Sequence, residues 1–509
     1  MTDQREAIRS NAKYLRNVRP IDPDEICDYV DGSPHPAVVR QHLREEAVDL
    51  GLIEREDGTF VPVGDEPVRP NRGPVERFPE SYEGRLEDLL VERYGVNWHE
   101  DAAGDLLRST IRRFKSRYLE GRRVEYDDDV AAGYAIYHLP GYYAAVQYAL
   151  DDLAERGLLD RNLRVLDVGA GVGGPALGLC DYLPDDALLE YHAIEPSAAA
   201  DVLEELLAET DRNVHTTVHR TTAEAFDPDT LPGNGEGGFD LVLACNVLSE
   251  LEDPRAVTES YLEALAPDGT LLAMAPADRN TSVQLREIER DLEGTRIDAG
   301  PSDADEANGT ADAPQSEVTV YGPTVRLWPG ETPSDRGWSF DVRPDLAVPA
   351  FQRRLDEATP EHDEERSPGE FVNVDVQFSH SLLRLDGRRR IDVDLETSER
   401  AKMAEMERHV TNRIDLAAAK LSRSLSETGD DGGDRPGSGN SNPLFKISDG
   451  SETVDHYAVL TRETSLNRAL LEADYGDVLS FEQALVLWND DEEAYNLVVD
   501  EETIVDRVS

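Results

Sequence analysis

A carboxylate and a group of glycines lie close together near residue 170, in a spacing that favours binding of a nucleotide-like ligand. Asp167 ends a short apolar run, and the glycines that follow it are Gly169, Gly171, Gly173 and Gly174. Glycine lets a backbone approach a ligand closely and turn its N–H groups toward it. Glu195 follows the next apolar run, about 20 residues past the glycines, where a carboxylate can accept hydrogen bonds from ribose hydroxyls. We therefore expect these residues to bind a ligand that contains a ribose.

Two kinds of cofactor fit such a loop, and a glycine turn without a ligand is the structural alternative. The dinucleotide fingerprint is G-x-G-x-x-G, whereas the order here is Asp-x-Gly-x-Gly-x-Gly. The stretch from Asp167 to Gly173 resembles the first motif of class I S-adenosylmethionine-dependent methyltransferases, and Glu195 resembles the end of their second. The resemblance implies S-adenosylmethionine as cofactor, with the glycine loop beside its methionine part and Glu195 at its ribose hydroxyls. The cofactor-binding residues implied are Asp167, Gly169, Ala170, Gly171, Gly173, Glu195, Thr222, Ala223, Glu224 and Asn246.

The elements that would position these residues alternate between strands and helices. Short apolar runs at 165–168, 190–194, 239–245 and 270–275 predict buried strands, and residues 256–265 predict a helix. This order predicts an α/β fold with a doubly wound, Rossmann-like sheet and a ligand crevice at the carboxyl ends of its strands. In the methyltransferase resemblance, residues 221–226 form the loop over the adenine ring.

The residues that would act on the methyl acceptor stay unknown at this stage. Asn246 is followed by Val247, so the Asn-Pro-Pro-aromatic signature of many amine methyltransferases is absent. Cys245 lies where pyrimidine carbon methylation would need a thiolate, but no proline precedes it, and a cysteine in an apolar strand usually behaves as a small hydrophobe. Glu250 and Asp278 are candidates for acid–base chemistry, and solvated or capping carboxylates explain them equally well.

Composition describes an acidic chain of several domains. The chain has 509 residues and a formal charge of −55, and its only lysines are Lys13, Lys115, Lys402, Lys420 and Lys446. Length alone predicts more than one domain. An acidic, lysine-poor surface is typical of adaptation to a salt-rich cytoplasm, where self-repulsion is screened. We therefore expect a halophilic protein. In such salt the negative charge of the protein does not exclude an RNA partner.

Cysteine usage and hydropathy point to the cytoplasm. The three cysteines are far apart and show no metal-ligand spacing, so we expect no metal site. No apolar run approaches the length of a membrane span, and the charged N-terminus lacks a signal-peptide core. We expect a soluble cytoplasmic protein without a membrane partner, and its oligomeric state is left open.

Patterns along the chain divide it into seven segments. Helices followed by a hairpin pattern predict a winged-helix-like module at the N-terminus, and short strand patterns predict a small β-rich domain at the C-terminus. Stretches rich in Gly, Ser, Asp and Glu predict disordered linkers. The expected segments are a winged-helix-like module (1–70), a helical region (71–160), the methyltransferase core (161–293), a linker (294–316), an insert that completes the core (317–425), a second linker (426–442) and the β-rich domain (443–509).

The helical region carries the densest basic cluster of the chain. It consists of Arg112, Arg113, Lys115, Arg117, Arg122 and Arg123. Arginine forks suit phosphate oxygens, so the cluster is a candidate RNA contact. A solvated helix face paired with Glu120 and Glu125 is the equally weighted alternative.

Three motifs together resemble one methyltransferase family. They are Tyr137-His138-Leu139-Pro140, Asn246 to Leu251, and Phe378-Ser379-His380 with Leu382-Leu383-Arg384. They are similar to the small-ribosomal-subunit-associated methyltransferase-like family of mitochondria and prokaryotes, over roughly residues 80–400. The resemblance implies association with the small ribosomal subunit or its rRNA. The sequence departs from the mitochondrial members at residues 321–340, which hold no cysteine for an iron–sulfur cluster.

The leading hypothesis is an enzyme that methylates RNA, with small-subunit rRNA as the favoured acceptor. One alternative is a ribosome-assembly factor that keeps the methyltransferase fold without catalysis. Another is a methyltransferase of small molecules. The accessory modules and the basic cluster favour a macromolecular partner.

Overall fold

The computed structural model describes residues 2–71, 73–231, 238–298, 315–331, 337–361, 363, 366–396, 399–427 and 442–508. Its contacts divide the chain into two compact units. The first unit contains residues 1–226, 239–241 and 344–376, and the second contains residues 227–238, 242–343 and 377–509. The first unit is therefore completed by a segment that returns to it late in the sequence.

The N-terminal module of the first unit consists of helices followed by a hairpin. Its helices are α1 (Thr2–Leu15), α2 (Pro23–Tyr29), α3 (Pro36–Glu45) and α4 (Ala47–Leu50), and its strands are β1 (Leu52–Glu54) and β2 (Phe60–Pro62). Asp22 caps α2 by accepting a hydrogen bond from the Asp24 amide, and Gly51 ends α4 with a left-handed φ of 59°. The helices bury Ile26, Leu43 and other apolar residues against Phe60. Helices and a hairpin follow one another here as the sequence predicts, and the winged-helix-like character of the module stays a prediction.

Three long helices follow in the first unit: α5 (Glu80–Tyr94), α6 (Asp101–Leu119) and α7 (Asp128–Ala154). Among the described residues, no helix is both long enough and apolar enough to cross a membrane. Asp127 caps α7 by accepting a hydrogen bond from the Val130 amide. Helix α7 is buried along most of its length, which makes it the central helix of this unit.

Pro140 lies inside α7 and removes one of the helix's hydrogen bonds, since proline has no N–H to donate to the carbonyl of Ile136. The buried side chain of Gln352, on α12 (Ala350–Glu357), supplies the missing donor, with 2.8 Å between its Nε2 and the Ile136 oxygen. Asn373 donates to the Tyr137 oxygen at 3.0 Å. The Tyr-His-Leu-Pro motif thus contains a proline that interrupts the hydrogen bonding of α7, which we call the proline site. Side chains of the returning segment, residues 344–376, bind the carbonyl groups that the proline leaves without a donor.

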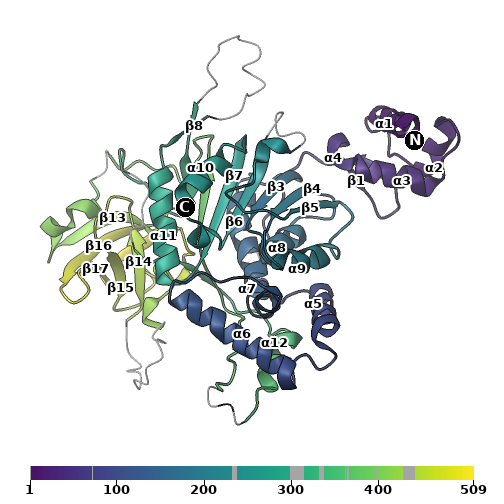
Figure 1. The fold of residues 1–509 in the computed structure, drawn as a ribbon. Coiled ribbons are helices and arrows are strands. Elements are labelled where there is room, and N and C mark those ends of the chain that lie inside the picture. The colour runs from purple at the N-terminus through teal and green to yellow at the C-terminus, as the bar shows by residue number, and fades with distance from the viewer. Residues whose placement is uncertain are drawn as a thin grey trace. The chain divides into compact units, whose positions relative to one another are not determined.

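The first unit also holds three parallel strands: β3 (Asn162–Val168), β4 (Leu188–Ile194) and β5 (Val214–His219). The helices that connect them are α8 (Gly174–Tyr182) and α9 (Ala199–Leu207), which lie beside these strands (Figure 1). Strands β3 and β4 are buried almost throughout, as expected of parallel strands that are covered on both faces. Their carboxyl ends meet at one edge.

The remaining core elements follow along the chain. They are β6 (Phe239–Cys245), α10 (Pro254–Leu262), β7 (Leu265–Pro276), α11 (Arg279–Leu292), β10 (Thr319–Gly322), β11 (Asp341–Arg343) and β12 (Val376–Arg384). The strand order of the main sheet is β10-β12-β7-β6-β3-β4-β5, with β11 paired to β12. Strand β12 is antiparallel to both of its neighbours in this order. The crossovers confirm the predicted doubly wound, Rossmann-like core.

Residues 294–316 are only partly the linker that the sequence predicts. Strands β8 (Arg296–Asp298) and β9 (Gln315–Glu317) pair in antiparallel fashion. Backbone hydrogen bonds of Gly294 and Thr295 with Val318 continue this pairing. The low-complexity composition therefore hid two short strands at the ends of the segment, while residues 299–314 lie outside the described residues.

The C-terminal part of the second unit is a six-stranded sheet. Its strands are β13 (Arg413–Lys420), β14 (Leu444–Ser448), β15 (His456–Leu460), β16 (Val478–Asn489), β17 (Ala494–Val499) and β18 (Ile504–Arg507). The order is β13-β14-β15-β17-β16-β18, and β13 also pairs with β16, which closes the sheet into a barrel-like form. The other short helical segments of the chain are η1 (Pro228–Thr230), η2 (Leu248–Glu250), η3 (Met403–His409), η4 (Leu425–Glu427) and α13 (Ala469–Glu472).

This β-rich domain begins earlier than residue 443, where the sequence placed its boundary. Strand β13 belongs to it, because Leu416 and Ala418 bury their side chains in the same core as Phe481. The boundary was misplaced because the composition of residues 426–442 resembles a linker between domains. That stretch instead lies between two strands of one sheet, and residues 428–441 are outside the described residues.

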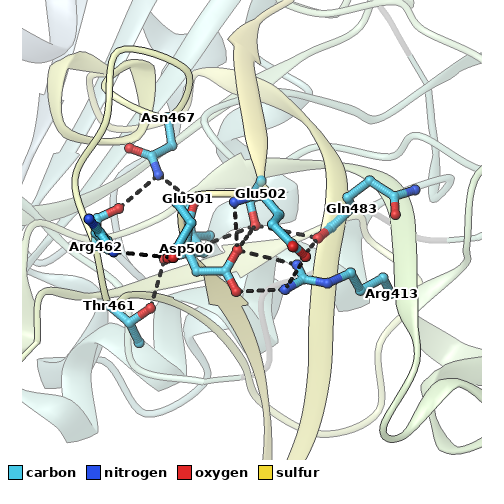
Figure 2. Close-up of polar contacts among 10 residues, drawn as sticks. Arg413, Thr461, Arg462, Asn467, Gln483, Asp500, Glu501 and Glu502 are labelled. Carbon is cyan, nitrogen blue, oxygen red and sulfur yellow. Dashed lines mark hydrogen bonds and ion pairs between the residues drawn. The ribbon is translucent and has the colours of Figure 1, made fainter.

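Charged and polar side chains connect the strands of the barrel-like sheet near the start of β13 (Figure 2). Arg413 donates to the Gln483 backbone oxygen at 2.6 Å and to a carboxylate oxygen of Asp500 at 2.7 Å. Asn467 donates to the backbone oxygens of Asp500 and Arg462 at 2.9 and 3.0 Å. These bonds tie the turn after β17 to β13 and β16, so we assign this cluster a structural role.

Candidate active site

The loop that joins β3 to α8 turns sharply at the carboxyl end of β3. Its left-handed glycines have φ values of 71° at Gly169, 56° at Gly171 and 93° at Gly173. The amides of Gly169 and Ala170 donate to the Ile194 oxygen of the next strand, at 2.9 and 3.1 Å. The loop is therefore fixed to the end of β4, and its glycines supply backbone conformations that other residues rarely adopt.

Two of these glycines have different surroundings. A Cβ atom at Gly173 would lie 2.6 Å from Cδ1 of Leu203, so packing against α9 requires glycine there. A Cβ atom at Gly171 would have no atom closer than the Gly169 oxygen, at 4.0 Å. The protein leaves open space outside Gly171, where a ligand can approach the backbone.

Glu195 lies beside this loop, as the sequence predicts, but it also bonds to the loop itself. Its carboxylate is buried and accepts hydrogen bonds from the amides of Gly171 and Ser197, both at 2.9 Å. Sequence reasoning expected ribose hydroxyls as partners and did not foresee the bond to Gly171. Each carboxylate oxygen has a second lone pair, so ribose hydroxyls can still bind.

Asp167 is the most deeply buried carboxylate of the site. Its Oδ2 accepts a hydrogen bond from the Tyr191 hydroxyl, while its Oδ1 is buried and has no partner among the described residues. Burial raises the pKa of Asp167 to about 7, and the negative charge of Glu195 adds to the effect, which the hydrogen bond from Tyr191 opposes. An orphaned carboxylate oxygen fits a cationic ligand, and S-adenosylmethionine carries an ammonium and a sulfonium group.

The loop expected over the adenine ring follows β5. Thr222 accepts backbone hydrogen bonds from the amides of Ala225 and Phe226, which closes a turn. Thr222 and Glu224 are exposed, and Ala223 is half-buried. The turn lies past the carboxyl end of β5, at the sheet edge that also carries the glycine loop, and its contact with the adenine ring stays a prediction.

Asn246 lies in the second unit, directly after β6. Its backbone is left-handed, with a φ of 60°, and its amide donates to the Met274 oxygen at 2.9 Å. It lines a small, partly open pocket at the carboxyl ends of β6 and β7. The other residues that line this pocket are Leu248, Ser249, Met274, Ala275, Pro276, Thr281, Gln284, Leu285 and Ile288.

The candidate acid–base groups have less specific surroundings. Asp278 caps α11, where it accepts hydrogen bonds from the amides of Asn280 and Thr281. Cys245 is a free cysteine buried at the end of β6, and Glu250 is half-buried in η2. The capping alternative therefore holds for Asp278.

Sequence reasoning missed a row of aromatic rings on α7. Tyr134, His138 and Tyr142 follow one another at intervals of four residues, the spacing that places side chains on one face of a helix. The His138 and Tyr142 rings stack with 5.2 Å between centroids and 6° between planes. Burial lowers the pKa of His138 to about 3, and the nearby charge of Lys115 adds to the effect, so the imidazole is neutral. The i, i+4 spacing was the signal that could have revealed the row.

The row extends from the start of α8 to the segment that follows β4. A Cβ atom at Gly174, the first residue of α8, would lie 2.8 Å from Cβ of Tyr142. At the other end, the centroids of the Tyr126 and Tyr134 rings lie 5.5 Å apart. The backbone oxygen of Tyr126 accepts a hydrogen bond from the backbone amide of Ala198, which lies three residues after Glu195. The aromatic row, defined as Tyr126, Tyr134, His138 and Tyr142, thus runs along the candidate cofactor site within the first unit.

Two residues of the basic cluster are committed to partners inside the first unit. Arg112 forms a two-pronged ion pair with Glu370, at 2.6 Å for each bond, and a hydrogen bond to Asp363 at 2.9 Å. The bond with Glu370 raises the pKa of Arg112. Lys115 donates to the Tyr137 hydroxyl at 2.9 Å. Both charges therefore hold other parts of the first unit, namely the segment 344–376 and α7, and a contact of these two residues with RNA stays a prediction.

The rest of the basic cluster lies on the surface. Arg113 and Arg117 are exposed one turn apart on α6, and Arg122 and Arg123 are exposed after its end. Arg122 pairs with Glu120 at 3.1 Å, as the structural alternative expected for part of the cluster.

Comparison with known proteins identifies the core. Residues 166–271 match the description "Methyltransferase domain". Residues 5–56 and 404–508 match the N-terminal and C-terminal domains of "Domain of unknown function (DUF8157)". No curated protein matches the chain. The first match agrees with the glycine loop, Asp167 and Glu195. The protein is an S-adenosylmethionine-dependent methyltransferase, and its cofactor is S-adenosylmethionine.

Several solved structures are similar in part. An S-adenosylmethionine-dependent methyltransferase from Clostridium acetobutylicum is 11% identical, with a TM-score of 0.24, and the match covers 48% of this chain and 92% of that one. An O-methyltransferase family protein from Burkholderia thailandensis is 16% identical, with a TM-score of 0.24 and coverage of 57% and 81%. The plantazolicin methyltransferase in complex with SAH is 16% identical, with a TM-score of 0.22 and coverage of 41% and 66%.

Proposed function

We propose that this methyltransferase acts on RNA in the cytoplasm, with small-subunit rRNA as the favoured acceptor. The observation that carries the proposal is the aromatic row beside the glycine loop, which begins near the exposed arginines of the basic cluster. Exposed Tyr118 connects the two, since its hydroxyl contacts that of Tyr126 and it follows Arg117 on α6. Proteins bind single-stranded RNA by combining backbone-tracking positive charge with aromatic rings on which bases stack.

The residues around the loop would each do a separate task. The bound cofactor supplies an electrophilic methyl group, which passes to an acceptor atom as the bond to the sulfonium sulfur breaks. Asp167 would hold the cationic end of the cofactor, and Glu195 would hold its ribose while fixing the Gly171 amide. The neutral His138 and its tyrosine neighbours would exclude water and present flat apolar faces to a planar acceptor.

The acidic surface sets the conditions under which such binding works. A formal charge of −55 repels RNA at low ionic strength, and this repulsion is screened at about 1 M salt, where the Debye length is about 3 Å. Because counterion release drives binding only weakly in such salt, base stacking has to provide most of the affinity. We propose that the protein works in a salt-rich cytoplasm, where the stacking surfaces of the aromatic row would contribute more to binding than the exposed arginines.

The proposal is tested by mapping rRNA methyl groups in a deletion strain, together with ribosomal-subunit profiles. Loss of one methyl mark on small-subunit rRNA, restored by the wild-type gene and not by a Gly171→Asp variant, is the expected result. Intact marks with defective subunits would instead indicate the assembly factor. Intact marks with normal subunits would contradict an rRNA acceptor and leave a small-molecule acceptor.

A further inference from the structure

We propose that Trp338 is an acceptor-binding residue that stacks on a planar base at the carboxyl end of β7. This inference rests on the proposed function, because it assumes a nucleobase acceptor. It uses a different part of the molecule, since Trp338 and all the residues around it described below belong to the second unit.

Trp338 is an exposed aromatic side chain that is nevertheless held in place. Its indole ring is 40% exposed, and its Nε1 donates a 2.7 Å hydrogen bond to the Ala277 oxygen. The ring of Phe340 lies 5.2 Å away, which supports the indole from one side. A large apolar ring that is fixed by a hydrogen bond and still faces solvent loses little entropy when it binds a partner.

The backbone beside Trp338 is fixed as well. The oxygen of Ser339 is buried and accepts hydrogen bonds from the hydroxyls of Ser282 on α11, at 2.7 Å, and Ser379 on β12, at 2.6 Å. Ser379 belongs to the Phe-Ser-His motif, whose role the sequence left open. On the other side of Trp338, the backbone at Gly337 packs closely against the ion pair between Lys446 and Asp455. This strap, residues 337–340, is therefore built to hold one indole ring in place.

The position of the strap is what assigns its role. Ala277 directly follows the last residue of β7, and Pro276 lines the pocket that also contains Asn246. In doubly wound folds ligands bind outside the carboxyl ends of the strands. The exposed ring thus lies next to a small, partly open pocket at the end of the sheet where an acceptor would bind. The side-chain amide of Asn246 can donate and accept hydrogen bonds at a base edge.

The test measures binding of a fluorescent single-stranded oligouridylate of about 10 nucleotides to the full-length protein. Trp338→Ala should weaken binding by about 5- to 150-fold, the effect of losing one base-stacking contact. Trp338→Phe should recover most of the loss, because it keeps a stacking ring without the bond to Ala277. The affinity for S-adenosylmethionine should not change in either variant.

Trp488→Ala is the matched control, since Trp488 on β16 is 38% exposed and also hydrogen-bonded, to Asp490. It should bind the oligouridylate like the wild type, and both alanine variants should keep their unfolding midpoints. Equal binding by Trp338→Ala and Trp488→Ala would overturn this inference alone. Failure of the wild type to bind the oligouridylate would overturn the proposed RNA acceptor and the inference with it.

Discussion

Gly171 is the residue at which a substitution can obstruct the cofactor without disturbing the protein's own packing. Its backbone is left-handed, and a side chain there would enter open space. Gly171→Asp should lower the affinity for S-adenosylmethionine by at least about tenfold, because the carboxylate blocks the approach of the cofactor to the backbone. The new Cβ atom also strains the left-handed backbone, at a cost of about 1–2 kcal/mol. Isothermal titration calorimetry measures this directly.

Gly51 provides the control for backbone strain. Its φ is 59°, close to the 56° of Gly171, and a Cβ atom there would also have nothing within 4 Å. Gly51→Asp should be destabilised about as much as Gly171→Asp while keeping wild-type cofactor affinity. Equal affinity of all three proteins for S-adenosylmethionine would contradict the assignment of the loop.

Asp167 makes both stability and cofactor binding depend on pH. Its pKa is about 7 in the folded protein and about 4 in an unfolded chain. The folded state therefore keeps the proton longer, and the free energy of unfolding of the apo-protein falls as the pH rises from about 4 to about 7. A cationic cofactor favours the ionised carboxylate, so its affinity should rise with pH by no more than about tenfold per unit and level off above about 7.

Asp167→Asn tests this pH dependence. Titrations with S-adenosylmethionine between about pH 6 and 8 should show a rising affinity for the wild type and a weaker, nearly constant affinity for the variant. A wild-type affinity that does not change over this range would show that another group, or none, carries the charge interaction.

The sequence could predict that a glycine loop and a carboxylate follow neighbouring strands, but not their contacts. Glycine spacing and a carboxylate at a strand end are local features, so Gly171 and Glu195 were found from their spacing alone. The bond between them, and the bond from Tyr191 to Asp167, depend on how two strands align side by side. Trp338 could not be singled out from the sequence, because its position depends on β7, α11 and β12 together.

At the scale of elements, Pro140 makes α7 depend on Gln352. Gln352→Leu would leave the buried Ile136 oxygen and the Asn373 amide without their side-chain partners. We expect a loss of about 1–3 kcal/mol in the free energy of unfolding of the first unit, because an unsatisfied buried polar group costs about that much. Urea denaturation followed by circular dichroism measures the change.

An exposed glutamine supplies the comparison. Gln41 lies on the surface of α3, where it donates only to Glu45. Gln41→Leu should change the free energy of unfolding by no more than about 0.5 kcal/mol. If Gln352→Leu had as small an effect, the proline site in α7 would have to be satisfied in another way.

The elements themselves were predicted where a pattern is strong within a short window. The strands of the core and the N-terminal helices and hairpin follow from apolar runs and turn residues. Strand β13 was not assigned to the β-rich domain, because its partners β14 and β16 lie beyond a linker-like stretch. Strands β8 and β9 were also not predicted from the sequence. They form because distant residues pair with each other, and amino-acid composition does not reveal such pairing.

At the scale of the whole molecule, charge should make stability depend on salt. With 106 acidic and 51 basic side chains, the folded chain repels itself more strongly than the expanded one. Raising KCl from about 0.1 to about 1 M shortens the Debye length from about 10 to about 3 Å, so the thermal unfolding midpoint should rise. NaCl at equal molarity should act alike if screening is the cause, and a midpoint that falls or stays constant would contradict this account.

The late return of residues 344–376 to the first unit has a consequence for how the protein is made. Gln352 and Asn373 are synthesised more than 200 residues after the carbonyl groups that they satisfy. At 5–20 residues per second, a nascent chain spends roughly 10–40 s with α7 complete but its proline site unsatisfied. During translation the chain therefore passes through a long-lived, partly folded state. In this state the carbonyl groups of Ile136 and Tyr137 still lack the side-chain partners that they have in the folded protein. Synthesis that pauses between α7 and Gln352 should lengthen the period in which chaperones and proteases reach this helix.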